Sequence, residues 1–440
     1  MRDEIRKRIE AVRRGEIPDG YIVENHQLRP LDWKYEKIGK YLVAHDEYSN
    51  DTERYMLATS SRQGLLPQTD YYNDQRFEET TGGFHVVPEG YVTYRHMSDD
   101  DVFKFNVNDL GAPVLVSPEY PVFTTNAELN QSLLIEYLNG TNEFRSFCRA
   151  QKKGSTRTRM YFGRLGEFMM PIPPILEQKK IADILATRDR LIDLKQKRVE
   201  ELKQLKKTYL AKMFPREGTD TPELRFPGFT APWEQRRLGD SFSFLQNNTL
   251  SRAELDDDSG EAKNVHYGDI LTELGDVLDT SRAQLPYISS ASITERYKGS
   301  LLHDGDVVMA DTAEDETAGK CTEVVNANGD PVLAGLHTIP MRPNRKYAAG
   351  YLGYYMNSPA YHNQLLPLMQ GIKVTSVSKS AILNTLIMSP SDFTEQAAIG
   401  RFFIKIDNLI NLHQRELEAE QQKKKALLQL LLTGLVRVPN

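Results

Sequence analysis

An internal repeat limits the folds open to this chain of 440 residues more than any other feature. The only two tryptophans, Trp33 and Trp233, lie 200 residues apart, and each opens a similar charged run. The motif Glu-Gln-x-x-Ile, which begins at Glu177, recurs at Glu395, and from there 34 residues align without a gap. Thirteen of these pairs are identical, whereas unrelated segments would match at roughly two positions. The sequence therefore predicts two similar modules in one duplicated chain.

Composition is ordinary for a globular protein, with 40% hydrophobic and 26% charged residues. No apolar run approaches the ~20 residues that a membrane span needs, and the N-terminus lacks the apolar core of a signal peptide. Cys148 and Cys321 lie in different modules and predict neither a zinc cluster nor a disulfide framework. We therefore expect a cytoplasmic, reduced protein that does not contact a membrane.

Each copy of the repeat predicts a long helix, about 176–214 in the first copy, after a boundary that is rich in proline. Apolar residues recur there every seven positions, which is the spacing of a coiled-coil seam. They are Leu185, Ile192 and Val199 in the first copy and Phe403, Ile410 and Leu417 in the second. The alternative interpretation is two separate amphipathic helices, each packed on its own module.

Chain order restricts the arrangement, because the first long helix leaves module one for module two and the second leaves module two. If the helices pair, they run antiparallel, with a pseudo-two-fold axis and a rod of about 57 Å for 38 residues. We predict an α+β fold with two globular domains separated by two long antiparallel coiled-coil helices. The predicted segments are an N-terminal helix (1–20), globular domain 1 (21–173), a central spacer helix (174–216), globular domain 2 (217–392) and a C-terminal spacer helix (393–440).

Shorter elements are also expected to repeat. A helix is predicted to begin at Leu133, and a second helix is predicted over 351–368. Asn139 and Asn357 occupy matching positions in these two segments. Between such anchors the modules differ greatly, which indicates one fold with two different surfaces.

The search for catalytic motifs finds almost nothing. The sequence has no phosphate-binding loop, no nucleophile elbow, no Asn/Asp-Pro-Pro-Tyr/Phe motif and no histidines at metal-ligand spacing. The nearest approach to a site is His337 with Asp311, Glu314 and Asp315, for which a structural interpretation, a strand edge and an acidic turn, is favoured. We therefore expect a protein that is not an enzyme and has no cofactor or metal of its own.

A basic stretch over 145–164 is more informative, because it contains seven basic side chains and no acidic one. Guanidinium and hydroxyl groups neutralise phosphates, and arginine can read guanine in the major groove. The second module has a thinner equivalent before its own long helix. The predicted DNA-binding residues are Arg145, Arg149, Lys152, Lys153, Ser155, Thr156, Arg157, Arg159 and Arg164, with Lys373, Thr375, Ser376 and Lys379 in module two. The alternative is a solvated basic surface without a ligand.

Taken together, these motifs resemble the specificity (S) subunit of type I restriction–modification systems over essentially the whole chain. Module two begins Leu224-Arg225-Phe226-Pro227-Gly228-Phe229 and continues to Trp233, and its segment from Gly305-Asp306-Val307 to His337-Thr338 is similar to one type of target-recognition domain. The resemblance implies that each module reads one half of a bipartite double-stranded DNA site and that the helices set the gap and dock two modification (M) methyltransferase subunits. Restriction (R) subunits join them, and S-adenosylmethionine, ATP and Mg²⁺ are expected in partner subunits only.

Two other classes of function stay open from the sequence. A fused endonuclease or methyltransferase would need catalytic motifs that were not found. A coiled-coil scaffold that binds proteins or glycans would account for the rod and the net charge of −6, but it would not account for basic loops at equivalent places in both modules.

Overall fold

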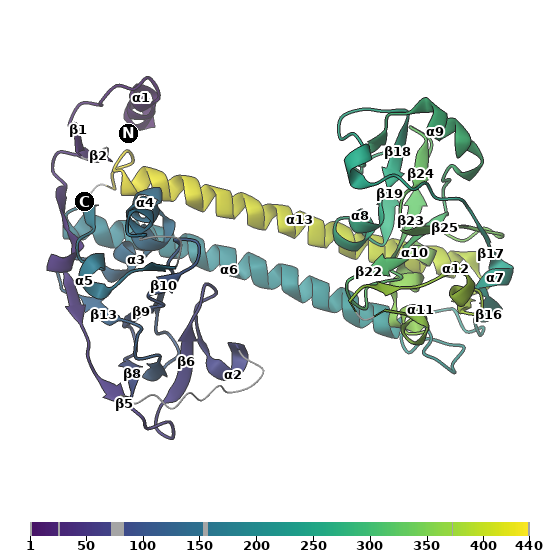
Figure 1. Cartoon of the computed structure of the whole chain (residues 1–440), viewed down its shortest axis with the longest axis horizontal. Coiled ribbons are helices and arrows are strands. Elements are labelled where there is room, and N and C mark those ends of the chain that lie inside the picture. Colours follow the sequence, from purple (N-terminus) through teal and green to yellow (C-terminus); the bar gives the residue numbers. More distant parts are fainter. Residues whose placement is uncertain (1, 25–26, 72–82, 153–156, 372, 439–440) are drawn as a thin grey trace. The chain divides into compact units, whose positions relative to one another are not determined.

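The computed structural model describes residues 2–24, 27–71, 83–152, 157–371 and 373–438 (Figure 1). The chain divides into two compact units, of which unit 1 comprises residues 1–194 with 416–440 and unit 2 comprises residues 195–415. Both units combine helices with sheets, which confirms the predicted α+β class. No described helix combines the length and the apolar character needed to cross a membrane. The division into five segments stays a prediction.

The central sheet of unit 1 has four antiparallel strands. They are β11 (Phe105–Val107), β9 (Val92–Tyr94), β13 (Val122–Thr125) and β4 (Leu42–Ala44), in spatial order. A second sheet has five strands, in the order β5 (Tyr48–Ser49), β8 (Phe84–Val87), β12 (Val114–Val116), β6 (Met56–Ser60) and β7 (Leu65–Pro67). Helices α3 (Gln131–Gly140) and α4 (Asn142–Ala150) share the main hydrophobic core with the central sheet, because Leu134 and Phe144 are buried in the same cluster as Tyr94 and Phe105.

The central sheet of unit 2 repeats this order and adds one strand. It runs β17 (Phe242–Phe244), β25 (Thr338–Pro343), β21 (Val307–Ala310), β23 (Cys321–Val325) and β19 (Val277–Asp279), and only β19 pairs in parallel. The second sheet is smaller, with β20 (Tyr287–Ile288), β18 (Ala262–Val265) and β24 (Val332–Ala334). The first four strands of the central sheet therefore match β4, β13, β9 and β11, and the units differ mainly in their second sheets.

The matched asparagines make the same contacts in both units. Asn139 accepts a hydrogen bond from the backbone N of Phe105 at 2.9 Å and donates to its carbonyl oxygen at 3.0 Å. Asn357 likewise accepts a hydrogen bond from the backbone N of Cys321 at 2.8 Å and donates to its carbonyl oxygen at 2.7 Å. Because Phe105 and Cys321 open matching strands, these bonds fasten the short helix to the sheet and confirm the predicted equivalence of the two segments.

Each tryptophan introduces a strand that pairs with the segment before a long helix. In unit 1, β3 (Lys34–Lys37) pairs with β15 (Met169–Ile172), and in unit 2, β16 (Glu234–Arg237) pairs with β27 (Leu386–Ser389). Both pairings are antiparallel. The repeat seen in the sequence is thus a repeat of structure at its two ends.

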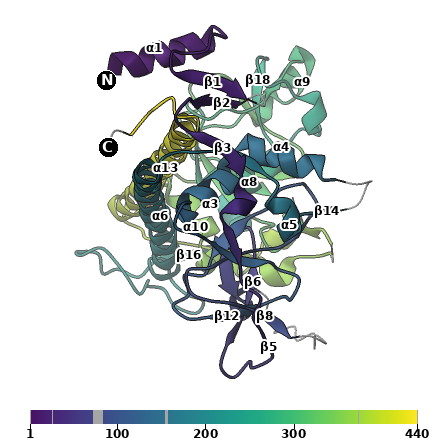
Figure 2. The same ribbon diagram turned by 90° about the vertical axis from the view of Figure 1, so that its left-hand side faces the viewer.

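The long helices are α6 (Ile175–Lys212) and α13 (Phe393–Leu432). In unit 1, Leu428 of α13 lies in the same core as Ile181 of α6, and Figures 1 and 2 both show the last part of α13 beside the first half of α6. In unit 2, the end of α6 meets the start of α13, where the rings of Tyr209 and Phe402 lie 5.0 Å apart. The helices are therefore antiparallel within each unit, and the alternative of two helices that each pack only on their own module is wrong.

The predicted seam residues are buried or half-buried. Leu185 and Val199 are buried and Ile192 is half-buried, and in the second copy Phe403 and Leu417 are buried and Ile410 is half-buried. The seam also contains an ion pair between the two helices, in which Arg188 donates to Glu420 at 2.9 Å.

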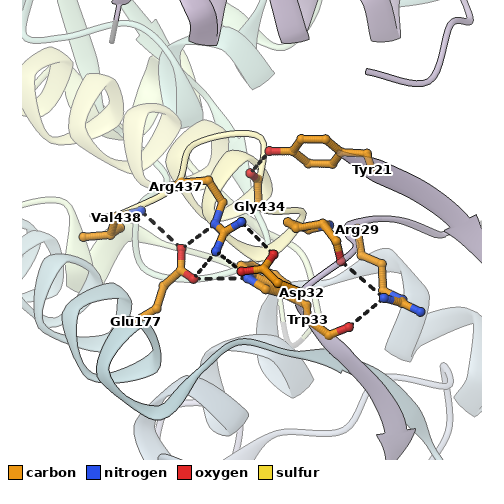
Figure 3. Close-up of polar contacts among 9 residues, drawn as sticks. Tyr21, Arg29, Asp32, Trp33, Glu177, Gly434, Arg437 and Val438 are labelled. Carbon is orange, nitrogen blue, oxygen red and sulfur yellow. Dashed lines mark hydrogen bonds and ion pairs between the residues drawn. The ribbon is translucent and has the colours of Figure 1, made fainter. Parts of the chain in front are cut away.

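Hydrogen bonds join the C-terminal tail to the N-terminal segment of unit 1 (Figure 3). We call the group formed by Arg437, Glu177, Asp32 and Trp33 the clasp. The guanidinium of Arg437 donates to both oxygens of Glu177 at 2.8 Å and to both oxygens of Asp32 at 2.7 and 2.9 Å. The indole N–H of Trp33 also donates to Glu177, at 3.1 Å. In unit 2, Glu395 at the matching position receives two hydrogen bonds from Arg225, at 2.7 and 2.8 Å.

The helix predicted over 351–368 is broken into three pieces, so that prediction is wrong in extent. The observed elements are α10 (Tyr351–Asn357), α11 (Pro359–His362) and a 3₁₀ turn, η4 (Leu366–Leu368). Pro359 explains the break, because proline has no N–H to donate and the residue before it is disfavoured in the helical region. The other expected helices are present as α3 and as α1 (Arg2–Arg13), which ends just before Gly15 with its positive φ of 77°.

Candidate nucleic-acid interface

Each unit carries a short two-stranded ribbon at the place where the basic loops were predicted. In unit 1, β10 (Met97–Ser98) pairs with β14 (Thr158–Arg159), and in unit 2, β22 (Thr312–Ala313) pairs with β26 (Thr375–Ser376). The hydrogen bonds that follow also match, since Met160 N donates to His96 O and Val377 N donates to Asp311 O, both at 2.8 Å. The two predicted loops therefore contribute strands to equivalent ribbons.

The basic residues of α4 are exposed because the opposite face of this helix is apolar. Phe144 and Cys148, four residues apart, are buried in the core, and residues with this spacing lie on one face of a helix. Arg145 and Arg149 follow them by one position and are exposed. The hydroxyl of Thr141 accepts a hydrogen bond from Phe144 N at 3.4 Å at the start of the helix.

The rest of the predicted site in unit 1 is placed only in part. Lys152, Arg157, Arg159 and Arg164 are exposed, and Arg164 lies in the short helix α5 (Phe162–Leu165). The predicted residues Lys153, Ser155 and Thr156 lie outside the described residues. Within the described part of the chain, Arg145, Arg149, Arg159 and Arg164 form no ion pair, so their charges are available to a ligand.

An acidic turn beside the ribbon was missed in the sequence. Arg157 Nε lies 2.6 Å from Asp99 Oδ1, Lys152 Nζ lies 3.9 Å from Asp101 Oδ1, and the hydroxyl of Thr158 donates to the same carboxylate. The side chains of Arg157 and Asp99 are 54% and 66% exposed, and a pair this exposed contributes at most about 1 kcal/mol. The guanidinium of Arg157 is therefore accessible and only weakly held by Asp99.

An aromatic ring also belongs to this surface. Tyr161 is exposed, and its ring stacks on that of His96 with the centroids 5.7 Å apart. Burial lowers the pKa of His96, and the nearby guanidinium groups of Arg159 and Arg95 act in the same direction. Arg95 is itself exposed. The spacing of Arg159 and Tyr161 could have revealed the tyrosine, because alternate residues of a strand face the same side.

The ribbon of unit 2 carries hydroxyl groups in place of arginine. Lys373, Ser376 and Lys379 are exposed and Thr375 is half-buried, and Lys379 begins the short helix α12 (Lys379–Ile382), which Ser378 caps. Arg159 of unit 1 therefore has Ser376 as its counterpart, given the matched registers of the two ribbons. The sites predicted from sequence are brought to the same place in each unit, but their chemistry differs.

His337 and Asp311 lie next to the unit 2 ribbon and form a pair, with 3.3 Å between Nδ1 and Oδ1. The backbone of His337 is left-handed, with φ of 55°, a conformation that is uncommon for a residue other than glycine. The ring of Tyr267 packs edge-on against His337 at 5.2 Å. Asp311 lies between β21 and β22, and Glu314 and Asp315 lie in the bend that follows β22, in agreement with the predicted strand edge and acidic turn.

No metal centre accompanies these groups in the described part of the chain. Among the residues that the structure describes, no three His, Cys, Asp or Glu side chains are grouped so that they could hold a metal ion. The arrangement offers charge, hydroxyl groups and an aromatic ring, which bind nucleic acid by neutralising phosphate, by hydrogen bonding and by stacking.

Two copies of one fold, each with a polar ribbon of different composition, define a protein with two related modules. The sequence matches the family described as the type I restriction modification DNA specificity domain, over residues 106–204 and 231–421. The chain belongs to this family and is a type I restriction–modification specificity subunit.

One known relative aligns with nearly the whole chain and a second with about three fifths of it. The specificity subunit of the type I restriction enzyme MjaVIII from Methanocaldococcus jannaschii is 24% identical over 433 residues, which cover 95% of this chain and 96% of the relative. The putative MjaX specificity subunit from the same organism is 24% identical over 287 residues, 62% of this chain and 61% of the relative.

Solved structures share the fold. The S subunit of a type I restriction–modification system from M. genitalium matches with a TM-score of 0.54 and 12% identity, and the match covers 93% of this chain and 97% of that one. A structure that describes complex assembly and conformational transition of a type I system matches with a TM-score of 0.53 and 13% identity, over 92% and 98% of the two chains.

Proposed function

We propose that each unit reads one half of a bipartite double-stranded DNA site through its ribbon and the basic residues beside it. The observation that carries this proposal is the equivalence of the two ribbons, which keep the same backbone pairing but present Arg159 in one unit and Ser376 in the other. A shared frame with different side chains suits a protein that reads two different sequences with one geometry. In this proposal the chain supplies recognition and performs no chemistry.

The paired helices would set the number of base pairs between the two half-sites. A rigid helix fixes both distance and rotation, since each added residue extends it by about 1.5 Å. Insertion of seven residues after Val199 and after Leu417 keeps the heptad seam in register and lengthens each helix by about 10 Å. The preferred gap should then increase by about three base pairs at 3.4 Å each, and an unchanged gap would remove this part of the proposal.

Exposed leucines on the helices suggest where methyltransferase subunits dock. Leu194 and Leu412 are identical at matching positions of the repeat, and they are 67% and 52% exposed. Identical exposed side chains at two equivalent positions of the repeat suit two equivalent partners. We propose that two modification subunits bind here, that restriction subunits join them, and that S-adenosylmethionine, ATP and Mg²⁺ bind in those partners.

The test of DNA reading is the double substitution Arg157→Ala with Arg159→Ala in the complex with methyltransferase subunits. The genomic target of the unaltered complex is first determined by sequencing methylated adenines. Loss of up to two phosphate contacts should weaken binding of the half-site read by unit 1 and reduce the slope of log affinity against log salt by about 1 to 2. Arg14→Ala, an exposed arginine of unit 1 that pairs with Glu16, is the control. Unchanged binding and methylation would exclude this ribbon as the contact surface.

A further inference from the structure

Two lysines related by the repeat, Lys206 and Lys424, each bridge carboxylates from two other elements. In unit 2, Nζ of Lys206 on α6 lies 2.6 Å from Asp276, next to β19, and 2.5 Å from Asp407 on α13. In unit 1, Nζ of Lys424 on α13 lies 2.6 Å from Asp189 on α6 and 3.0 Å from Glu136 on α3. Each cluster therefore joins both long helices to the globular part of its own unit.

The lysine and its facing aspartate are identical in the two clusters, whereas the third group differs. Asp189 matches Asp407 in the sequence repeat, as Lys206 matches Lys424. Glu136 stands at the position that Tyr354 occupies in unit 2, where the tyrosine hydroxyl donates to Asp407 at 2.6 Å. The short helix of each unit thus reaches the same lysine–aspartate pair with a different side chain.

Several charged groups of the two clusters are largely buried, which affects their pKa values. The lysine side chains are only 18% and 21% exposed. Burial raises the pKa of Glu136 and of Asp276, and the lysine in each cluster acts against that rise. For Lys206, burial acts to lower the pKa, but the attraction of Asp276 and Asp407 outweighs it. A charged lysine in each cluster therefore requires both of its partners to stay in place.

Such a cluster permits only one register of the elements that it joins. A slip of one helical turn moves a side chain by about 5.4 Å, which would break contacts of 2.5–3.0 Å. Buried ion pairs are a weak source of stability, because desolvation offsets their attraction, and specifying register is their best-attested use. Apolar seam residues alone specify register less strictly, since one leucine can replace another in the seam.

We infer that Lys206 and Lys424 are positioning residues that fix the gap between the DNA half-sites by holding each recognition unit at one register on the helix pair. This inference rests on the proposed function. A recognition unit that slides or turns on its helices no longer meets one spacing, because each base pair advances the site by about 3.4 Å and turns it by about 35°.

The experiment uses the complete complex with its methyltransferase subunits and a set of DNA substrates with the same half-sites and gaps from two base pairs shorter to two longer. Lys206→Ala and Lys424→Ala are compared with Lys207→Ala and Lys425→Ala, which alter exposed neighbours that are also identical in the repeat. In the first two variants, methylation at the original gap should decrease about tenfold relative to that at the adjacent gaps. The half-site sequences should stay the same.

Lysine removal leaves buried carboxylates unpaired and could unfold the unit, so a second variant removes all charge from one cluster. Lys206→Met with Asp276→Asn and Asp407→Asn removes the three charges of this cluster together, and neutral replacements of this kind are often tolerated. If this variant folds and keeps the original gap preference, the inference is wrong. If the unaltered complex shows no bipartite target at all, the proposed function fails instead, which separates the two outcomes.

Discussion

Unit 1 and unit 2 begin the same short helix with different groups. In unit 1, Asn130 caps α3 with its own side chain, which accepts a hydrogen bond from Leu133 N at 3.0 Å. In unit 2, α10 begins after Gly350, which has no side chain to offer, and Glu323 from β23 accepts hydrogen bonds from Gly350 N and Gly353 N at 2.8 Å. The geometry of the helix is kept while the source of its cap has moved from the chain beside it to a distant strand.

The comparison teaches which parts of the repeat tolerate change. Positions that fix the frame keep their residue, as Asn139 and Asn357 do, or keep their role with another residue. Positions on the ribbons differ in charge, as Arg159 and Ser376 do. A frame that holds its geometry allows the side chains of the two ribbons to vary independently of one another.

The two tryptophans make the comparison measurable, because each unit contains one. With Trp33→Phe or Trp233→Phe, urea unfolding followed by tryptophan fluorescence reports one unit at a time. Stability differences between the units can then be assigned.

The largest effect is expected for Glu395→Ala. Glu395 is 1% exposed and Arg225 is 14% exposed as side chains, so the substitution leaves a guanidinium largely buried without its partner, which costs about 3–5 kcal/mol. Glu177→Ala should cost less, because Arg437 keeps its two hydrogen bonds to Asp32. Equal costs in urea unfolding would show that the clasp and its counterpart are energetically the same.

The cap of α10 in unit 2, Glu323, can titrate, whereas the cap of α3 in unit 1, Asn130, cannot. The free energy of unfolding of unit 2 should therefore depend on pH through its cap. Burial raises the pKa of Glu323 from 4.5 to about 7, against the backbone hydrogen bonds that lower it. The folded state then holds a proton that the unfolded state has lost, so the free energy of unfolding of unit 2 falls by up to about 3 kcal/mol as pH rises from 4.5 to 7. Glu323→Gln should remove this component. The same slope in the variant would assign the pH dependence to another group.

Gly353→Ala should destabilise unit 2 by about 1–3 kcal/mol through overpacking. An added Cβ would lie 2.0 Å from the carbonyl oxygen of Asp276, a backbone atom. The matching position in unit 1 is Ile135, which packs against the core, so unit 1 has room there for a large side chain. A neutral result in the unfolding midpoint would mean that the chain at Asp276 moves aside readily.

Asn130→Ala should destabilise unit 1 by about 1 kcal/mol, the usual value for loss of a helix N-cap. Asn130→Asp is the control, because aspartate also caps well. If alanine and aspartate gave the same stability, the cap would contribute nothing in unit 1, and the comparison with Glu323 would lose its energetic meaning.

The smallest effect on stability is expected for Asp99→Asn. The pair with Arg157 is exposed, so its loss should change the free energy of unfolding by less than about 1 kcal/mol. DNA affinity of the complex should increase for two reasons. Arg157 no longer has to give up its ion pair with Asp99 before it binds phosphate, and one negative charge is removed from the surface. Lower affinity, measured at fixed salt, would mean that Asp99 itself contacts the DNA.

The sequence alone determined the duplication and the long helices, and it located the two predicted binding loops at equivalent places in the chain. Heptad spacing and a gapless match of 34 residues are patterns of residue order. They can therefore be read from one sequence without knowledge of the fold. The seam residues and the matched asparagines were predicted for this reason. The predicted DNA-binding residues gather at equivalent ribbons, although their contacts with DNA stay a prediction.

Only the tertiary structure decided which polar groups meet. The pairing of Arg157 with Asp99, of Glu323 with Gly350, and of Lys206 with Asp276 joins residues 27 to 70 positions apart. No periodicity marks such pairs, because they depend on how strands and helices are brought together in space. The break at Pro359 is the opposite case, since the proline was visible and the continuous helix was predicted in spite of it. The sequence specified the repeated elements, and long-range packing decided how each unit holds its helices and how much of its charge is left for a ligand.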